Sequence, residues 1–199
     1  AHFRAQGIAV PEVYAVSEDA VAYIQEDLGD TALFGIVGSE GSEELLCRTV
    51  RCLPDIQFKG ADGFDFSVCH SVCRFDRRLV LFDLNYFKYC FLKPSGLEFD
   101  ENRLQDDFER LADDLTSVKT DTFMYRDFNA RNVMIKDGAP CFIDFQGGMR
   151  GPIYYDVASF IWQARSRYPE DLKMELVDKY IKALGAYMEV DKEEFMSRL

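Results

Sequence analysis

The first apolar runs of the chain have the composition of β-strands. Residues 13–16 (VYAV) and 21–24 (VAYI) are rich in β-branched and aromatic side chains, and the polar segment Ser17-Glu18-Asp19 lies between them. Two such runs joined by a short polar segment predict a β-hairpin. A polar, glycine-bearing connector follows at residues 25–30.

Helical periodicity dominates the remainder of the chain. Asp100 is placed to cap a helix with one apolar stripe, and the acidic residues of that segment lie away from the stripe, as on a solvated face. The stripe consists of Leu104, Phe108, Leu111, Ala112, Leu115 and Val118. Further helices are predicted over residues 43–53 (capped by Ser42 and disturbed by Pro54), 77–92, 155–165 and 170–187.

A short β-rich region interrupts the helices near the middle of the chain. Residues 122–125 form a predicted strand, and residues 132–136 and 140–144 flank Asp137-Gly138. An Asp-Gly pair between alternating strands is the strongest short-range signal for a hairpin. The whole pattern therefore predicts an α+β fold that is mostly helical and contains a small hairpin.

The composition is that of a globular protein. The chain has 199 residues, of which 48% are hydrophobic and 29% charged, and its formal net charge is −12. Acidity disfavours nucleic-acid binding, which depends on Lys and Arg at phosphates, and no apolar stretch approaches the roughly 20 residues that span a bilayer. We therefore expect no nucleic-acid partner, no membrane association and a cytoplasmic location, whereas the sequence does not fix the oligomeric state.

The six cysteines are expected to be reduced and partly buried. A chain of this size can build its core without disulfides, and most of its cysteines lie within apolar runs. Cys69-His70-x-x-Cys73 offers zinc-ligand residue types at an unusual spacing. Packing in the core is the preferred interpretation of this segment over a zinc site.

Three oxygen-bearing side chains are expected to meet at one edge of the predicted hairpin. Asp127 and Asn132 are five positions apart in the polar loop after the first strand, and the hairpin returns Asp144 to the same end. Asn and Asp supply oxygen ligands suited to Mg²⁺, which otherwise binds phosphate and water. A further carboxylate beside such a metal can accept a proton from a hydroxyl nucleophile.

Residues 123–158 (FMYRDFNARNVMIKDGAPCFIDFQGGMRGPIYYDVA) resemble the aminoglycoside phosphotransferase family, which includes choline-kinase-like enzymes. The resemblance implies a protein-kinase-like fold and transfer of the γ-phosphate of ATP, with Mg²⁺, to a hydroxyl of a small molecule. Ile143-Asp144-Phe145-Gln146 followed by Gly151-Pro152 most resembles bacterial kinases of amino sugars, such as N-acetylmuramate and N-acetylglucosamine kinases.

The resemblance also assigns roles to individual positions. Asp127 resembles the catalytic base, Asn132 and Asp144 resemble the Mg²⁺ ligands, and Asp156 resembles the acidic residue that supports the catalytic loop. Gln25, Glu26 and Leu28 lie in a segment that resembles the hinge, which binds adenine through backbone groups.

Further candidate contacts lie in the catalytic loop and in the aromatic helix. Two roles are open for Arg131, namely stabilising the transferred phosphate or pairing with a carboxylate. The helix around residues 82–91 lies where the family builds its acceptor pocket, and Asp83, Asn85 and Tyr86 are candidate acceptor contacts. For most aromatic side chains of this helix, packing in the core is the favoured interpretation.

The sequence departs from the family pattern in two places. Tyr125-Arg126 stands where the family usually has His-Gly, and the first lysine is Lys59, so no phosphate-gripping strand lysine precedes the first hairpin. We therefore expect residues 1–29 to be a remnant of an N-terminal lobe (hairpin and hinge). Residues 30–199 would be a helical C-terminal lobe with the catalytic loop at 125–132 and the metal-aspartate segment at 141–152.

Two functions remain open at this stage. The retained base and metal ligands favour an ATP-dependent small-molecule kinase acting on a sugar or amino sugar. The missing lysine and phosphate loop favour instead a catalytically inactive binding or regulatory module of the same fold. Under either interpretation we expect weak or no ATP turnover from these 199 residues alone.

Overall fold

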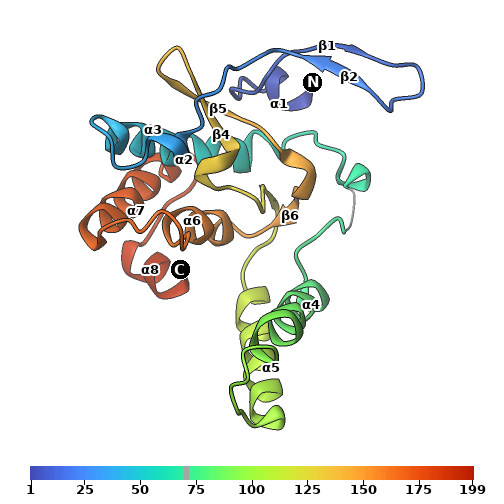
Figure 1. Ribbon diagram of the computed structural model, residues 1–199, viewed down its shortest axis with the longest axis vertical. Helices are drawn as coiled ribbons and strands as arrows, with labels where there is room; N and C mark the ends of the chain where they lie inside the picture. Colours follow the sequence, from blue (N-terminus) through green and yellow to red (C-terminus); the bar gives the residue numbers. More distant parts are fainter. Residues whose placement is uncertain (70–71) are drawn as a thin grey trace.

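The computed structural model describes residues 1–69 and 72–199 and shows an α+β fold dominated by helices (Figure 1). Its strands form three separate two-stranded antiparallel sheets, which pair β1 with β2, β3 with β6 and β4 with β5. The strands are β1 (Val13–Val16), β2 (Tyr23–Gln25), β3 (Thr122–Met124), β4 (Val133–Lys136), β5 (Ala139–Phe142) and β6 (Met149–Gly151).

Both predicted hairpins are confirmed. β1 and β2 pair across the polar turn, and the second strand begins two residues later than the sequence pattern suggested. The central hairpin, β4–β5, turns at Asp137 (φ 50°) and Gly138 (φ 71°), both left-handed. Two left-handed residues are what a tight type I′ turn requires, and the Asp-Gly pair supplies them.

The body of the molecule is built around one long helix, α3 (Ser42–Phe58), which packs against α7 (Glu170–Leu184) and α6 (Tyr154–Ile161). The predicted extent of this helix, residues 43–53, was too short, because α3 continues through Pro54 to Phe58. Proline removes one backbone donor, but the turn beyond it is held by burial of Ile56 and Gln57. The Gln57 side chain donates to the Ile153 carbonyl and accepts from the Tyr180 hydroxyl.

Three other predicted helix boundaries also change. Gly41, not Ser42, is the N-cap of α3, and the Ser42 hydroxyl instead accepts the Gly38 amide. α6 ends at Ile161, where the Gln163 side chain donates to the carbonyl of Phe160 and satisfies the helix end. α7 ends at Leu184, three residues before the predicted end.

The short helices of the body are α1 (His2–Ala5), α2 (Leu33–Ile36) and α8 (Lys192–Arg198).

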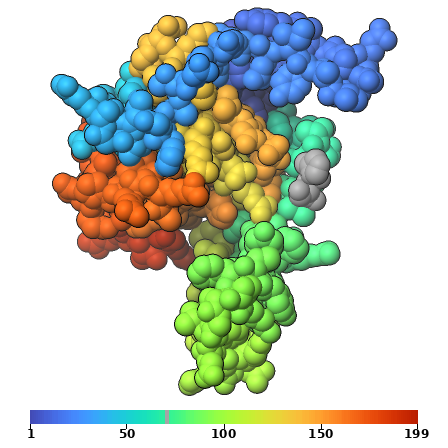
Figure 2. Space-filling model, in the orientation of Figure 1, coloured from blue at the N-terminus to red at the C-terminus, as the bar shows by residue number. Residues whose placement is uncertain are grey.

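A helical arm projects from the body (Figures 1 and 2). It consists of α4 (Arg77–Phe87), a π-helical turn η2 (Lys88–Leu92) and α5 (Glu101–Thr116), and α4 packs on α5. Asp100 caps α5 as predicted, because its carboxylate accepts the amides of Asn102 and Arg103. The acidic residues of α5 are exposed, in agreement with a solvated face.

Core packing of the aromatic residues in the arm was a wrong prediction. Phe82 and Tyr86 are each 64% exposed, and Tyr89 and Phe91 are 58% and 61% exposed. In the arm, α4 and α5 pack mainly on each other, which covers one face of each helix and leaves the opposite face open to solvent. The α5 stripe divides in the same way, because Phe108 and Ala112 are buried while Leu111 and Leu115 are exposed.

The cysteines are free thiols throughout the described residues, and four of the six are buried or half-buried, whereas Cys73 and Cys90 are exposed. The zinc alternative at residues 69–73 involves His70, which lies outside the described residues. Within the described ranges, no helix is both long and apolar enough to cross a membrane.

Candidate functional site

The loop that follows β3 is held from below by a buried carboxylate. Asp156, on α6, is fully buried, and its two oxygens accept the backbone amides of Tyr125 and Arg126, each at 2.8 Å. Burial raises the pKa of Asp156 to about 7, while the two amide hydrogen bonds act in the opposite direction. The position of the loop thus depends on a residue about 30 positions further along the chain.

Asp127 begins the exposed part of this loop. Its backbone carbonyl accepts the side-chain amides of Asn132 at 2.9 Å and Asn129 at 3.0 Å, which closes the loop locally. The carboxylate has no hydrogen-bond or ion-pair partner among the described residues. Partial burial and, next, the negative charge of Asp144 raise the pKa of Asp127. The Ile143 amide donates to the Asn132 carbonyl at 3.1 Å, and this bond holds the Asp144 segment beside the loop that carries Asp127.

Asp144 sits at the end of the central hairpin in a left-handed conformation (φ 68°). The preceding carbonyl, of Ile143, accepts the hydroxyl of Tyr125, and the ring of the following residue, Phe145, lies 4.3 Å from the Tyr125 ring, centroid to centroid. Tyr125 is fully buried. It therefore links the loop that carries Asp127 to the segment that carries Asp144.

The donor set at this edge fits Mg²⁺. The amide nitrogen of Asn132 is used within the loop, which leaves its oxygen and the carboxylates free of protein partners in the part of the chain that the structure describes. Mg²⁺ keeps several water or phosphate ligands and needs only one or two carboxylates from a protein. The described His, Cys, Asp and Glu side chains form no cluster of three or more that would hold a metal by themselves.

Two cavities lie at this edge of the hairpin. The hinge cavity, of about 730 Å³, lies between the first hairpin and the end of the central hairpin and is lined by Asp144 and Gln25. The loop cavity, of about 430 Å³, is lined by Arg126, Asp127, Gly147 and others. Gln146 lines both cavities. Asp144 therefore lines one of these cavities and Asp127 the other.

Gly147 permits the close approach of the loop to the Asp144 segment. A Cβ at this position would lie 2.9 Å from the Asp127 carboxylate oxygen, which is closer than side chains tolerate. The signal that could have identified it is its place three residues after Asp144, opposite the catalytic loop.

The predicted hinge residues have different surroundings. Gln25 ends β2 and lines the hinge cavity, whereas Glu26 and Leu28 do not. The Glu26 amide donates to the Glu12 carbonyl, and its carboxylate pairs with Lys136 of the central hairpin. The Lys136 hydrogen bond is the main reason that the pKa of Glu26 is lowered. The hinge is therefore tied to the central hairpin through this ion pair.

The four remaining candidate contacts do not gather in one place. The Arg131 guanidinium lies 5.2 Å from the centre of the Phe34 ring, and no described carboxylate pairs with it. Asn85 donates to the Leu81 carbonyl within α4, and Tyr86 faces solvent. Of the three candidates on α4, Asp83 reaches the loop, where it pairs with Arg126, a residue that the sequence did not single out as functional.

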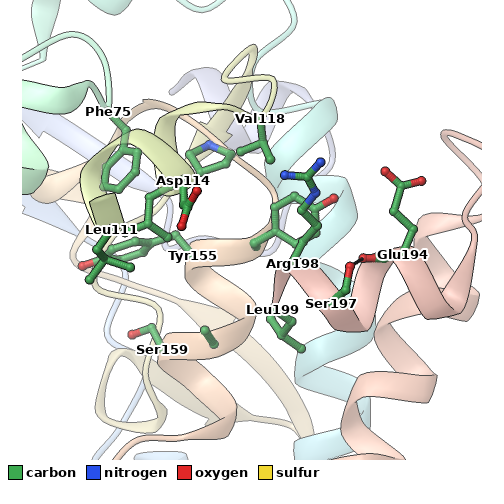
Figure 3. Close-up of a pocket in the computed structure, with 14 residues that line it drawn as sticks. Phe75, Leu111, Asp114, Val118, Tyr155, Ser159, Glu194, Ser197, Arg198 and Leu199 are labelled. Carbon is green, nitrogen blue, oxygen red and sulfur yellow. Dashed lines mark hydrogen bonds between the residues drawn. The ribbon is translucent and has the colours of Figure 1, made fainter. Parts of the chain in front are cut away.

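A third cavity, of about 830 Å³, lies where α5, α6 and α8 approach one another (Figure 3). Its wall is largely apolar, with Leu111, Val118 and Tyr155 beside the charged Arg198 and Glu194. None of Asp127, Asn132 and Asp144 lines it. Although it is larger than the other two, it is separate from the carboxylate edge.

A central hairpin carried on a mostly helical body, with a β-hairpin beside it, is a kinase-like fold. Choline kinase LicA from Streptococcus pneumoniae is similar to this chain with a TM-score of 0.64 at 12% identity, over 99% of this chain and 63% of that chain. An aminoglycoside-3'-phosphotransferase of type VIII is similar with a TM-score of 0.55 at 15% identity, over 98% and 74% of the two chains.

The chain belongs to the phosphotransferase enzyme family, whose sequence profile matches residues 1–194. Two N-acetylmuramate/N-acetylglucosamine kinases are similar in sequence. The protein of Neisseria meningitidis is 28% identical over 87% of this chain and 52% of its own length, and that of Pseudomonas aeruginosa is 24% identical over 88% and 51%. The chain thus spans about half the length of these curated relatives.

Proposed function

We propose that this chain carries the catalytic part of a small-molecule kinase that transfers the γ-phosphate of ATP to a hydroxyl of a sugar or amino sugar. The observation that carries the proposal is a pair of cavities, one lined by Asp144 and the other by Asp127, that share Gln146 in their walls. Phosphoryl transfer needs a donor and an acceptor on opposite sides of the reacting phosphate. The named amino-sugar kinases among the relatives support the acceptor class.

Each cavity takes one reactant in this proposal. The hinge cavity receives the nucleotide, with its apolar wall against the base and the Gln25 strand end at its rim. Asn132 and Asp144 would hold Mg²⁺, and the bound ion would neutralise negative charge on the transferred phosphate. In this proposal, residues 1–29 form the hairpin and hinge beside the nucleotide, and residues 30–199 form the lobe that carries the catalytic loop and binds the acceptor.

Asp127 orients the acceptor hydroxyl in the loop cavity and accepts its proton. Its carboxylate faces this cavity without a described partner, and its raised pKa makes it a better base than an ordinary exposed carboxylate. Asp156 fixes the position of the loop that carries Asp127 by accepting two of its backbone amides. The hydrogen bond from the Tyr125 hydroxyl to the Ile143 carbonyl holds the Asp144 segment beside the loop.

Phosphate transfer from ATP tests the proposal directly. The full-length protein is assayed with Mg²⁺ against N-acetylglucosamine, N-acetylmuramate, choline and an aminoglycoside. We expect transfer to the amino sugars and a loss of about 100-fold or more in kcat for Asp127→Ala. Asp106→Asn, an exposed substitution on α5, is the matched control.

Two outcomes would overturn parts of the proposal. Full activity of Asp127→Ala would show that Asp127 is not the catalytic base. Absence of turnover by the full-length protein on the whole panel, together with no rise in melting temperature with ATP and Mg²⁺, would favour an inactive binding module. Transfer to choline alone would contradict a sugar or amino-sugar acceptor, but it would still agree with phosphate transfer from ATP to a hydroxyl.

A further inference from the structure

Arg126 occupies a backbone conformation that suits glycine. Its φ is 71°, in the left-handed region that disfavours residues with a Cβ, and the family resemblance places glycine at this position. Its amide is nevertheless fixed, because it donates to Asp156 at 2.8 Å. A side chain kept at an unfavourable conformation suggests that the side chain has a function.

The Arg126 side chain reaches from the loop to the helical arm. Its Nη2 donates to both carboxylate oxygens of Asp83, on α4, at 2.9 Å and 3.1 Å. The two side chains are 25% and 36% exposed. A half-buried charge pair with two hydrogen bonds is screened less by solvent than the open ion pairs elsewhere on the arm.

This pair crosses the junction between the arm and the body. The arm is otherwise joined there by a small apolar cluster, separate from the main core. Its buried members are Phe75, Leu79, Val80, Ala112, Met124 and Met149. Figures 1 and 2 show how far the arm extends beyond this junction. The Arg126–Asp83 pair is thus a polar contact at the base of a projecting arm.

We propose that Arg126 and Asp83 are positioning residues that fix the arm against the catalytic loop and thereby shape the loop cavity beside Asp127. Arg126 is itself part of the cavity wall. Asp83 holds its guanidinium against α4. The activity readout of this inference rests on the proposed function, whereas the structural readout below does not.

Amide hydrogen exchange of the loop tests the coupling without any substrate. We expect Asp83→Asn to increase exchange at the amides of Tyr125 and Arg126 by about 10-fold, since a hydrogen bond to a charged group is lost. Asp113→Asn is the matched control, because it removes the 2.6 Å contact from Arg77 that lies within the arm. It should change exchange in the loop by less than about 2-fold.

Two substitutions at Arg126 separate the ion pair from the backbone conformation. Arg126→Gly loses the pair and relieves the left-handed strain, while Arg126→Ala loses the pair and keeps the strain. We expect both variants to increase exchange at the N-terminal half of α4 by about 10-fold. Unchanged exchange in α4 for both variants, or in the loop for Asp83→Asn, would overturn the inference.

Kinetics with N-acetylglucosamine and ATP give a second readout. Asp83→Asn is expected to raise the acceptor KM or lower kcat, with about a 10-fold loss in kcat/KM, and to leave the KM for ATP within about 2-fold. Arg126→Lys should recover part of the loss seen for Arg126→Gly. The double variant Asp83→Asn/Arg126→Gly should be no worse than the poorer single variant.

The two proposals fail in different ways. A wild-type protein that does not turn over any acceptor contradicts the proposed function, and the exchange measurements still decide the coupling. An active enzyme whose acceptor kinetics are unaffected by Asp83→Asn contradicts the positioning role alone. Additive losses in the double variant would likewise show that the two side chains act independently.

Discussion

The body and the helical arm use the same kinds of side chain in opposite ways. Phe128, Phe160 and Tyr180 of the body are fully buried, because elements pack on several sides of them. Phe82, Tyr86 and Phe91 of the arm are each more than 60% exposed, because they lie on faces of the arm that no other element covers. The difference shows that aromatic content alone does not decide burial. The number of elements that surround a side chain decides it.

The largest expected effect is on stability, and it compares a buried aromatic residue of the body with an exposed one of the arm. Phe160→Ala should lower the free energy of unfolding by about 3–5 kcal/mol, since it leaves a cavity in a closely packed core. Phe91→Ala should change it by less than about 0.5 kcal/mol. Urea unfolding followed by circular dichroism measures both, and equal effects would contradict the contrast between body and arm.

The next effect concerns the buried carboxylate under the loop. Asp156→Asn replaces one of two accepting oxygens with a donor that faces a backbone amide. At neutral pH we expect a loss of about 1–3 kcal/mol in unfolding free energy and a marked loss of phosphate transfer. Chemical denaturation and the amino-sugar assay measure these losses. A variant with wild-type stability and activity would show that the loop does not need this support.

The same residue predicts a pH dependence. The pKa of Asp156 lies near 7 in the folded protein against an ordinary value of 3.8, so between these pH values the folded state holds a proton that the unfolded state has released. Its contribution to stability is therefore greatest below about pH 4 and declines as pH rises to about 7. Unfolding measured from pH 4 to pH 8 should show this decline relative to Asp156→Asn, and parallel curves would contradict it.

A smaller effect is expected at the hydroxyl that joins the loop to the Asp144 segment. Tyr125→Phe removes one hydrogen bond, to the Ile143 carbonyl, and keeps the ring packing against Phe145. We expect a loss of about 1 kcal/mol in stability and a modest fall in kcat. Phe142→Leu, a volume change in the same buried region, is the comparison that separates packing from the hydroxyl.

The smallest effect is expected on the acidic face of the arm. Asp106→Asn alters an exposed residue on α5, away from the buried Phe108 and Ala112. The unfolding free energy should stay within about 0.5 kcal/mol of wild type, as measured by thermal and urea unfolding. A larger change would show that the acidic face contacts something and is not merely solvated.

Local signals in the sequence predicted most of the elements. The Asp-Gly turn, the Asp100 cap and the apolar stripes required only short-range rules, and the structure contains the hairpin and helices that they indicate. Element ends were less predictable. Helix α3 continues past Pro54 because Gln57 finds partners on α6 and α7, and a contact of this range leaves no mark in the local pattern.

The candidate site was predicted in part. The loop and hairpin pattern identified Asp127, Asn132 and Asp144, and their assigned roles stay predictions. Arg126, Gly147 and the Tyr125 hydroxyl were missed as contributors, because their significance depends on close approaches between segments that only the folded chain brings together.

The sequence by itself determined the elements, the chemistry-bearing residues and the family, because turn residues, caps and periodicity act over a few positions. The tertiary structure alone decided which apolar faces are covered, which carboxylates are paired and which stay free. Asp83 illustrates the division. The sequence made it one of three candidate acceptor contacts of the aromatic helix, and the folded chain adds an ion pair with an arginine 43 residues away. The free energy of a charge depends on its neighbours in space, and the neighbours are set by packing.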